Sequence, residues 1–179
     1  MRDFTSLLIA LLLLTSNPLF AATYYVSNAG NNSNSGLSLA QAFLTLQKGA
    51  DVALAGDTVL VANGTYAGFD FRNKNGTATN RVVFQAMGVN VLINQSGPIR
   101  SDGINIENAN YVTVDGFIVN GMPGNGNGVR VVLSDFCVVR NCSCDGNSER
   151  GITDQTNHNN SPRAAHNVSA NQCFCAPAR

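Results

Sequence analysis

The amino-acid sequence predicts an all-β fold, a right-handed parallel β-helix with about 25 residues in each coil. The first observation is an internal repeat. Asn110–Gly121, "NYVTVDGFIVNG", matches Asp135–Gly146, "DFCVVRNCSCDG", at a constant 25-residue offset. The second is that "GINI" at Gly103–Ile106 returns as "GVRV" at Gly128–Val131 with the same offset, and "GIT" at Gly151–Thr153 begins a third copy. A fixed period of this length, with short strands and turns inside each unit, is typical of solenoids.

The third observation is the composition. The chain holds 17 glycines and only 12% charged residues, and long amphipathic runs of helix formers are scarce. Leucine-rich repeats share this repeat length but would show an L-x-x-L-x-L pattern, which is absent. The 11 basic and 11 acidic residues cancel, so the sequence lacks the basic footprint of a nucleic-acid-binding protein.

Residues 1–22 have the three parts of a secretory signal peptide. Arg2 precedes the apolar run Leu7–Leu14, and Pro18 and the small residues Ala21 and Ala22 follow it. We expect cleavage just after Ala21 or Ala22. The apolar run is short for a membrane span, so a membrane anchor is the less favoured alternative. The mature protein is expected to be secreted or periplasmic, with no membrane attachment.

Residues 23–153 are expected to form the β-helix itself. Within Ser38–Ala53, apolar residues recur at spacings of three and four, which predicts an amphipathic helix of about three turns. These residues are Leu39, Ala42, Phe43, Leu46 and Ala50. A solenoid end exposes unpaired backbone and core, so this helix is predicted to be the N-terminal cap. From Thr58 onward, short β-prone runs alternate with Gly, Asn and Asp turns.

The repeat also predicts which side chains stack on one another. Equivalent strands of successive coils pair about 4.8 Å apart, so each position lies on its predecessor. Inside the coil, Ile104 is expected under Val129, Ile106 under Val131, Val112 under Cys137 and Val119 under Cys144. Outside, Asn105 is expected under Arg130, Asn120 under Asp145 and Asp115 under Arg140.

Five cysteines raise the question of disulfides. Cys137, Cys142 and Cys144 occupy positions that are apolar in the preceding coil, so they are predicted to be buried thiols. A disulfide and a zinc site are the alternatives, and the C-x₄-C-x-C spacing is poor for tetrahedral zinc. The disulfide state of Cys173 and Cys175 stays open.

Residues 154–179 show no alternating pattern, although they hold His158 and His166. The repeat predicts an aromatic-led strand near residue 159, where "NNSPRAAH" stands instead. No further strand is therefore expected here. Two interpretations remain: a chain cut short, for example by a shifted reading frame, and a ragged C-terminal cap or tail.

The stretches "TYYVS", "LQKGADVALAGDTVLVANGTY" and "NRVVFQAM" resemble the first coils of secreted β-helix proteins of the pectate-lyase-like superfamily. The resemblance covers about Thr23 to Ile152. It implies a β-helix fold and relatives that act on uronic-acid polysaccharides, and it makes Ca²⁺ possible as a cofactor. Lyases, hydrolases, epimerases and non-enzymes share such coils, so no activity is implied by the resemblance alone.

The candidate substrate-binding residues are Asn105, Arg130, Asp102 and Arg150, at the coil face that follows each opening glycine. A guanidinium can bind a uronate carboxylate with two parallel hydrogen bonds. The alternative is an ordinary solvated outer face.

No catalytic residue can be assigned from the sequence. β-Elimination needs a base and a cation or arginine that neutralises the uronate. Lys48 and Lys74 lie on the predicted cap helix and in a turn. The acidic residues are expected on different sides of the coil, with no three of them converging, so no metal site is predicted. These residues are Asp102, Glu107, Asp115, Asp135 and Asp145.

The sequence therefore predicts an exported, carbohydrate-active β-helix protein of polysaccharide-lyase type, present as an incomplete N-terminal portion, with acidic polysaccharide as its partner. A non-catalytic glycan-binding or adhesin-type module and an inactive truncated product are the alternatives.

Overall fold

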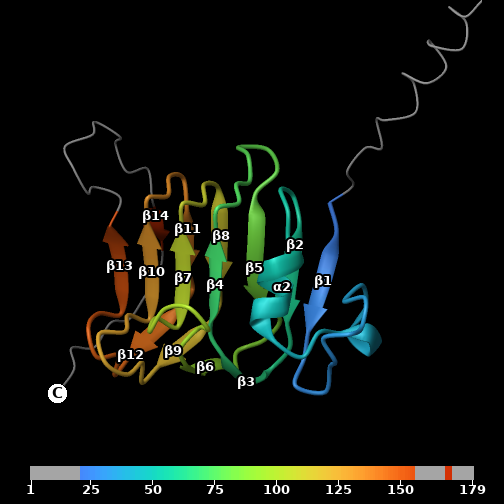
Figure 1. Ribbon diagram of the computed structural model, residues 1–179, viewed down its shortest axis with the longest axis horizontal. Coiled ribbons are helices and arrows are strands. Elements are labelled where there is room, and N and C mark those ends of the chain that lie inside the picture. Colours follow the sequence, from blue (N-terminus) through green and yellow to red (C-terminus); the bar gives the residue numbers. More distant parts are fainter. Residues whose placement is uncertain (1–20, 156–167, 171–179) are drawn as a thin grey trace, which may run out of the picture.

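The computed structural model describes residues 21–155 and 168–170, which form a right-handed parallel β-solenoid of about four turns with about 26 residues per turn. Figure 1 shows the coils stacked along the long axis, with one short helix near the N-terminal end. None of the described helices is long and apolar enough to cross a membrane. Residues 1–20 of the predicted signal peptide lie outside the described residues, as do His158, His166, Cys173 and Cys175.

Three parallel sheets run along the solenoid, and each of four successive coils contributes one strand to each of them, while the first and last described strands extend one sheet only. In spatial order, sheet A consists of β1 (Thr23–Val26), β2 (Thr58–Val61), β5 (Val82–Ala86), β8 (Val112–Asp115), β11 (Val138–Arg140) and β14 (Val168–Ala170). Sheet B consists of β3 (Gly64–Ala67), β6 (Val91–Gln95), β9 (Ile118–Asn120) and β12 (Ser143–Asp145). Sheet C consists of β4 (Phe69–Arg72), β7 (Ile104–Glu107), β10 (Val129–Val132) and β13 (Ile152–Gln155).

The predicted register of the last coils is confirmed. Val129 pairs with Ile104, and Cys144 pairs with Val119. The inward side chains of these strands form one continuous core, in which the thiols of Cys142 and Cys144 are buried as predicted. The thiol of Cys137 is buried as well, and burial raises its pKa to about 11. Apolar residues recur at 25-residue spacing because each fills the same interior position of successive coils.

The repeat also fixes the turns between strands. Tyr111 and Phe136, which are equivalent residues of successive coils, both have left-handed backbone conformations, with φ angles of 56° and 58°. Their rings stack with centroids 4.6 Å apart and planes 7° from parallel. Asn108 and Leu133 form a second such pair, each with a φ of 50°. Non-glycine residues seldom adopt this conformation, so its recurrence shows that successive coils turn in the same way.

The predicted helix over residues 38–53 is wrong in its extent. The structure has a 3₁₀ turn at Leu39–Gln41 and a helix, α2, at Leu46–Val52. Between them Phe43 is extended and bridges β1, where its N–H donates to the Tyr25 carbonyl at 2.8 Å. The backbone bonds offered by β1 override the helical pattern here. Leu39 is 52% exposed and lies outside the core, whereas the other four residues of the predicted apolar face are buried.

β13 continues sheet C, and Ile152 pairs with Val129 in the register that the sequence predicted for the third copy. The expectation that residues 154–179 hold no further strand is wrong. Further along the chain, β14 pairs with β11, with Val168 opposite Val138. The offset between these two strands is longer than that of the repeat, so a search at a fixed period does not find β14.

Candidate functional site

The outer face of sheet C carries a group of polar and charged side chains, which we call the sheet C cluster. Two consecutive outward rows of the sheet supply most of it. Asp70 pairs with Asn105, which pairs with Arg130, and Arg130 pairs with Thr153. The cluster comprises Asp70, Arg72, Arg100, Asp102, Asn105, Glu107, Asn127 and Arg130.

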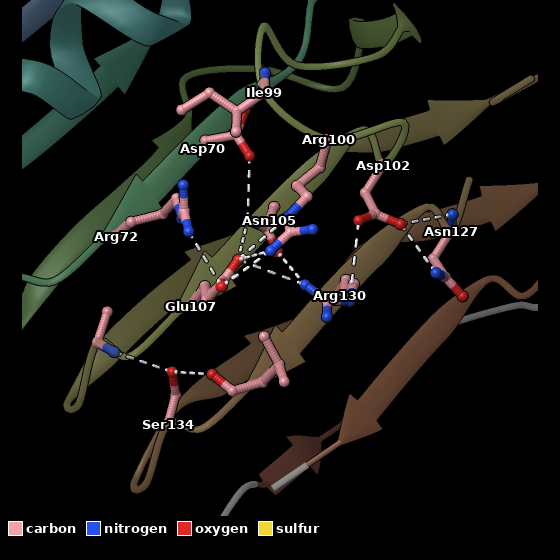
Figure 2. Close-up of polar contacts among 12 residues, drawn as sticks. Asp70, Arg72, Ile99, Arg100, Asp102, Asn105, Glu107, Asn127, Arg130 and Ser134 are labelled. Atoms are coloured by element: carbon pink, nitrogen blue, oxygen red, sulfur yellow. Dashed lines mark hydrogen bonds and ion pairs between the residues drawn. The ribbon is translucent and has the colours of Figure 1, made fainter. Parts of the chain in front are cut away.

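Glu107 is the centre of this cluster, because three arginines converge on its carboxylate (Figure 2). Arg72 Nη2 lies 3.1 Å and Arg100 Nη2 lies 3.0 Å from Oε1. Arg130 Nη1 lies 3.6 Å from Oε2. The three guanidiniums come from β4, the loop before β7, and β10, so the carboxylate ties three coils together.

The ionisation of Glu107 follows from these contacts. Burial by itself would raise the pKa of this carboxyl group, but hydrogen bonds from Arg100, Asn105 and Arg72 outweigh burial and lower the pKa to about 2. Glu107 is therefore a fixed negative charge at neutral pH. It cannot serve as a general acid there, and a carboxylate held so strongly ionised is a weak base.

Asn105 is an outward residue that is nevertheless completely buried. Its Nδ2 donates to Asp70 Oδ1 at 3.0 Å and lies 3.3 Å from Glu107 Oε2, while its Oδ1 accepts from Arg130 Nη1 at 2.9 Å. The loop before β7 covers it from outside, where the Ile99 N–H donates to Asp70 Oδ2 at 3.0 Å. Asn105 therefore lies on the outward row under Arg130, as predicted, but it has no exposed surface.

Asp102 is buried too and links the loop to the next coil. Its Oδ1 accepts from both the backbone N–H and the side-chain Nδ2 of Asn127, each at 2.8 Å. Its Oδ2 lies 4.0 Å from Arg130 Nε. Arg130 is thus held by Asp102, Asn105 and Glu107, and its side chain is only 18% exposed.

Arg150 does not join the cluster. Its side chain is exposed, and its contact with the neighbouring coil is made by its backbone carbonyl, which accepts from the Gly128 N–H at 2.9 Å. The structure therefore brings together three of the four predicted residues, namely Asp102, Asn105 and Arg130. Asp102 and Glu107, which were expected on different sides of the coil, both contact Arg130.

Sequence reasoning missed Asp70, Arg72 and Arg100. The spacing between β4 and β7 is longer than the repeat, so the first two do not appear at the 25-residue offset. Aligning the strands by their alternating apolar residues would have found them. Phe69 and Phe71 of "FDFR" match Ile104 and Ile106 of "INIE", which places Asp70 beside Asn105 and Arg72 beside Glu107.

The cluster does not fit a Ca²⁺ ion. Calcium needs several carboxylate or carbonyl oxygens that converge on one point. Here the oxygens of Asp70, Asp102 and Glu107 accept from N–H groups, and arginine side chains occupy the space among them. Over residues 21–155, no group of three or more His, Cys, Asp or Glu side chains is arranged to hold a metal ion.

No family model matches this sequence, and no curated protein matches it either. Solved structures do share its fold. A GH136 lacto-N-biosidase from Eubacterium ramulus is similar with a TM-score of 0.61 and 17% identity, over 74% of this chain and 30% of that chain. A rhamnogalacturonan lyase is similar with a TM-score of 0.60 and 18% identity, over 72% of this chain and 37% of that chain. Pectate lyase Pel9A is similar with a TM-score of 0.59 and 21% identity, over 73% of this chain and 35% of that chain.

These likenesses show the fold, a parallel β-helix of the pectate-lyase-like kind, which two polysaccharide lyases and a glycoside hydrolase share with this chain. The chain spans about a third of the length of each of these three structures.

Proposed function

We propose that this chain belongs to an exported, carbohydrate-active β-helix protein of polysaccharide-lyase type, and that its sheet C cluster binds acidic polysaccharide. The observation that carries this proposal is the convergence of three guanidiniums on one side of the solenoid, around Glu107. The fold shared with two lyases that act on polysaccharides supports the substrate class.

Arg72 and Arg100 keep exposed hydrogen-bond donors in addition to those that contact Glu107. The side chain of Arg100 is 42% exposed and that of Arg72 is 31% exposed. Each contributes Nη2 to the carboxylate, and Nη1 of each makes no hydrogen bond with the described part of the chain. These Nη1 groups can donate to a uronate carboxylate or a sugar hydroxyl. Arg100, the more exposed of the two, is the main contact that we propose.

Arg130 takes a different role from the one the sequence suggested. Its contacts with Asp102, Asn105 and Glu107 bury most of it, so we assign it to positioning Glu107 and the loop that carries Arg100. The cluster holds three arginines and three carboxylates, so its formal charges cancel. Affinity must come from directed hydrogen bonds rather than from net charge, and we expect it to be modest and sensitive to salt.

Binding is the step that these coils support best. The eliminative step needs a base that removes the proton at C5 of the uronate. In residues 21–155 the cluster's carboxylates are engaged as acceptors, and Lys74 is engaged at the N-terminal cap, where its ammonium donates to the carbonyls of Ala50, Asp51 and Ala53. We therefore expect oligogalacturonate to bind without forming unsaturated product. A non-catalytic glycan-binding module is the second candidate, favoured by the same observation.

Calorimetric titration with oligogalacturonate tests the proposal. Arg100→Gln should weaken binding several-fold or more, because it removes a charged donor from the cluster. Arg150→Gln is the matched control, because it removes the same charge from an exposed arginine outside the cluster. Equal weakening by both variants would show that net charge, and not the cluster, attracts the ligand. Product detected by its ultraviolet absorbance would show that the chain also cleaves.

A further inference from the structure

The backbone nitrogen of Ala22 lies against a buried carboxylate, although the first strand begins one residue later. The Ala22 N–H donates to Asp57 Oδ1 at 2.7 Å. The Ala22 carbonyl accepts from the Thr58 N–H at 2.9 Å, which places it at the start of β2. Ala22 is therefore part of the folded coil, fixed at both its backbone groups.

Asp57 is a buried acidic residue, 4% exposed, whose second oxygen accepts from the Leu54 N–H at 2.9 Å. Asp102 and Asp115, which are buried to a similar degree, lie 4.0 Å and 2.9 Å from arginine nitrogens. Asp57 forms no ion pair within residues 21–155. Asp70, which is equally buried, also forms no ion pair there and accepts from Asn105 Nδ2 and the Ile99 N–H. A buried charge is costly unless a countercharge compensates it, so a cation beside Asp57 would stabilise the fold.

The sequence in front of Ala22 is the end of the predicted signal peptide. Signal peptides are cut after small residues, with a second small residue preferred two positions earlier. A cut after Ala21 puts Leu19 at that earlier position, whereas a cut after Ala22 puts Phe20 there. Neither residue is small, but the aromatic ring of Phe20 departs further from the preference.

We propose that the chain is processed at the Ala21–Ala22 bond and that the new α-ammonium of Ala22 forms an ion pair with Asp57. Hydrolysis adds one water: Ala21 leaves with the carboxylate, and the nitrogen of Ala22 becomes an ammonium group. That nitrogen already lies at hydrogen-bond distance from Asp57 Oδ1, so the neutral contact becomes a charge-assisted one without rearrangement. Processing then stabilises the end of the solenoid from which the coils stack.

The position of the cut is the first test. The whole chain is exported from a bacterial host, and the N-terminus of the exported protein is sequenced and its mass measured. Ala22 as the first residue is the expected result. Thr23 as the first residue, or retention of the leader, would overturn the proposal.

The second test compares two forms of the protein that differ by one residue, one beginning at Ala22 and one at Ala21, each released from a fusion by cleavage directly before that residue. The Ala21 form keeps a neutral amide at the Ala22 nitrogen. We expect the Ala22 form to melt about 4 °C higher at pH 7. Equal melting temperatures would contradict the ion pair.

Two further measurements separate the ion pair from other effects of the extra residue. In an Asp57→Asn background the two forms should melt alike. The difference should also vanish at high pH. A free α-amino group has a pKa of about 8, and a paired one is higher, so the stabilisation is present below about pH 8 and is lost as the pH rises through the folded value. Tyr24 also faces this carboxylate, and burial and Asp57 raise its pKa. A difference that persists in Asp57→Asn or at high pH would assign it to packing.

Discussion

The outer faces of sheets C and B are built on the same coils but differ in charge. On sheet C, the row Asp70, Asn105, Arg130 and Thr153 joins a network that is largely covered by the loop before β7. On sheet B, the corresponding row of Thr65, Leu92, Ile118 and Ser143 has no ionisable side chain. An open groove of about 550 Å³ lies there, with Asn63, Asn90 and Asn120 along its edges.

The comparison shows where a solenoid is constrained and where it is free. Interior positions of both sheets must pack on the coil before and after, so both are filled by similar apolar side chains. Outward positions carry no such requirement. On sheet C, the strands supply Asp70, Arg72, Glu107 and Arg130, and the loop before β7 adds Arg100 and Asp102 and shields their partners from water. We therefore expect substitutions on the two faces to have very different effects.

The largest expected effect is that of Glu107→Gln on stability. This variant removes the carboxylate that faces three guanidiniums, and the remaining positive charges repel one another. Breaking a buried ion pair costs about 3–5 kcal/mol, and the partial exposure of Arg72 and Arg100 reduces our expectation to about 2 kcal/mol. Urea denaturation measures the free energy of unfolding.

Asn120→Ala on sheet B is the control for this variant. Asn120 is half-buried, and its Oδ1 accepts from the Asp145 N–H at 3.3 Å. We expect a loss of about 0.5 kcal/mol or less, as for other surface substitutions. Similar losses in the two variants would mean that the sheet C cluster stabilises the fold no more than the outer face of sheet B does.

The sequence predicted interior positions of the solenoid better than positions outside its core. The interior register, for example Val129 on Ile104, was predictable because each side chain stacks directly on its equivalent. The extent of the cap helix was not, because Phe43 finds its backbone partners in β1, far from the helical pattern in sequence.

The candidate site was predictable only in part. Asp102, Asn105 and Arg130 follow the 25-residue repeat, and the sequence pointed to them. Arg100 lies in the loop before β7, where the next coil has Asn125, so the repeat does not point to an arginine there. Its contact with Glu107 depends on how the loop folds back over sheet C. The burial of Asn105 depends on the same loop, so alternation along the strand could give its direction but not its exposure.

The next effect concerns pH. The folded pKa of Glu107, about 2, lies below its ordinary value of 4.5. Ionised Glu107 therefore contributes stability that is fully present above about pH 4.5 and is lost as the pH falls through 2. The melting temperature of the wild type should fall more steeply over this window than that of Glu107→Gln. Parallel profiles for the two proteins would show that the arginines do not hold Glu107 ionised.

The smallest effect on an ion pair is expected on sheet A, where atoms of Asp115 and Arg140 lie 2.9 Å apart. The sequence predicted this pair from the 25-residue offset. Arg140 is half exposed, and Asn141 Nδ2 also donates to Asp115 at 2.8 Å. Arg140→Gln should therefore cost about 0.5 kcal/mol in urea denaturation. A loss as large as that of Glu107→Gln would show that ion pairs on all faces of the solenoid contribute equally.

The most direct test of a glycan-binding sheet C is an NMR titration that follows the side chains of both faces in one experiment. Tri-galacturonate is added to the labelled protein, and the Nε–Hε signals of the arginines and the side-chain amide signals of the asparagines are recorded. The proposed function predicts concentration-dependent shifts for Arg100 and Arg72, a smaller shift for Arg130, and unchanged signals for Asn63, Asn90 and Asn120. Shifts of the three asparagines with unchanged arginine signals would place the ligand on sheet B and contradict the proposal.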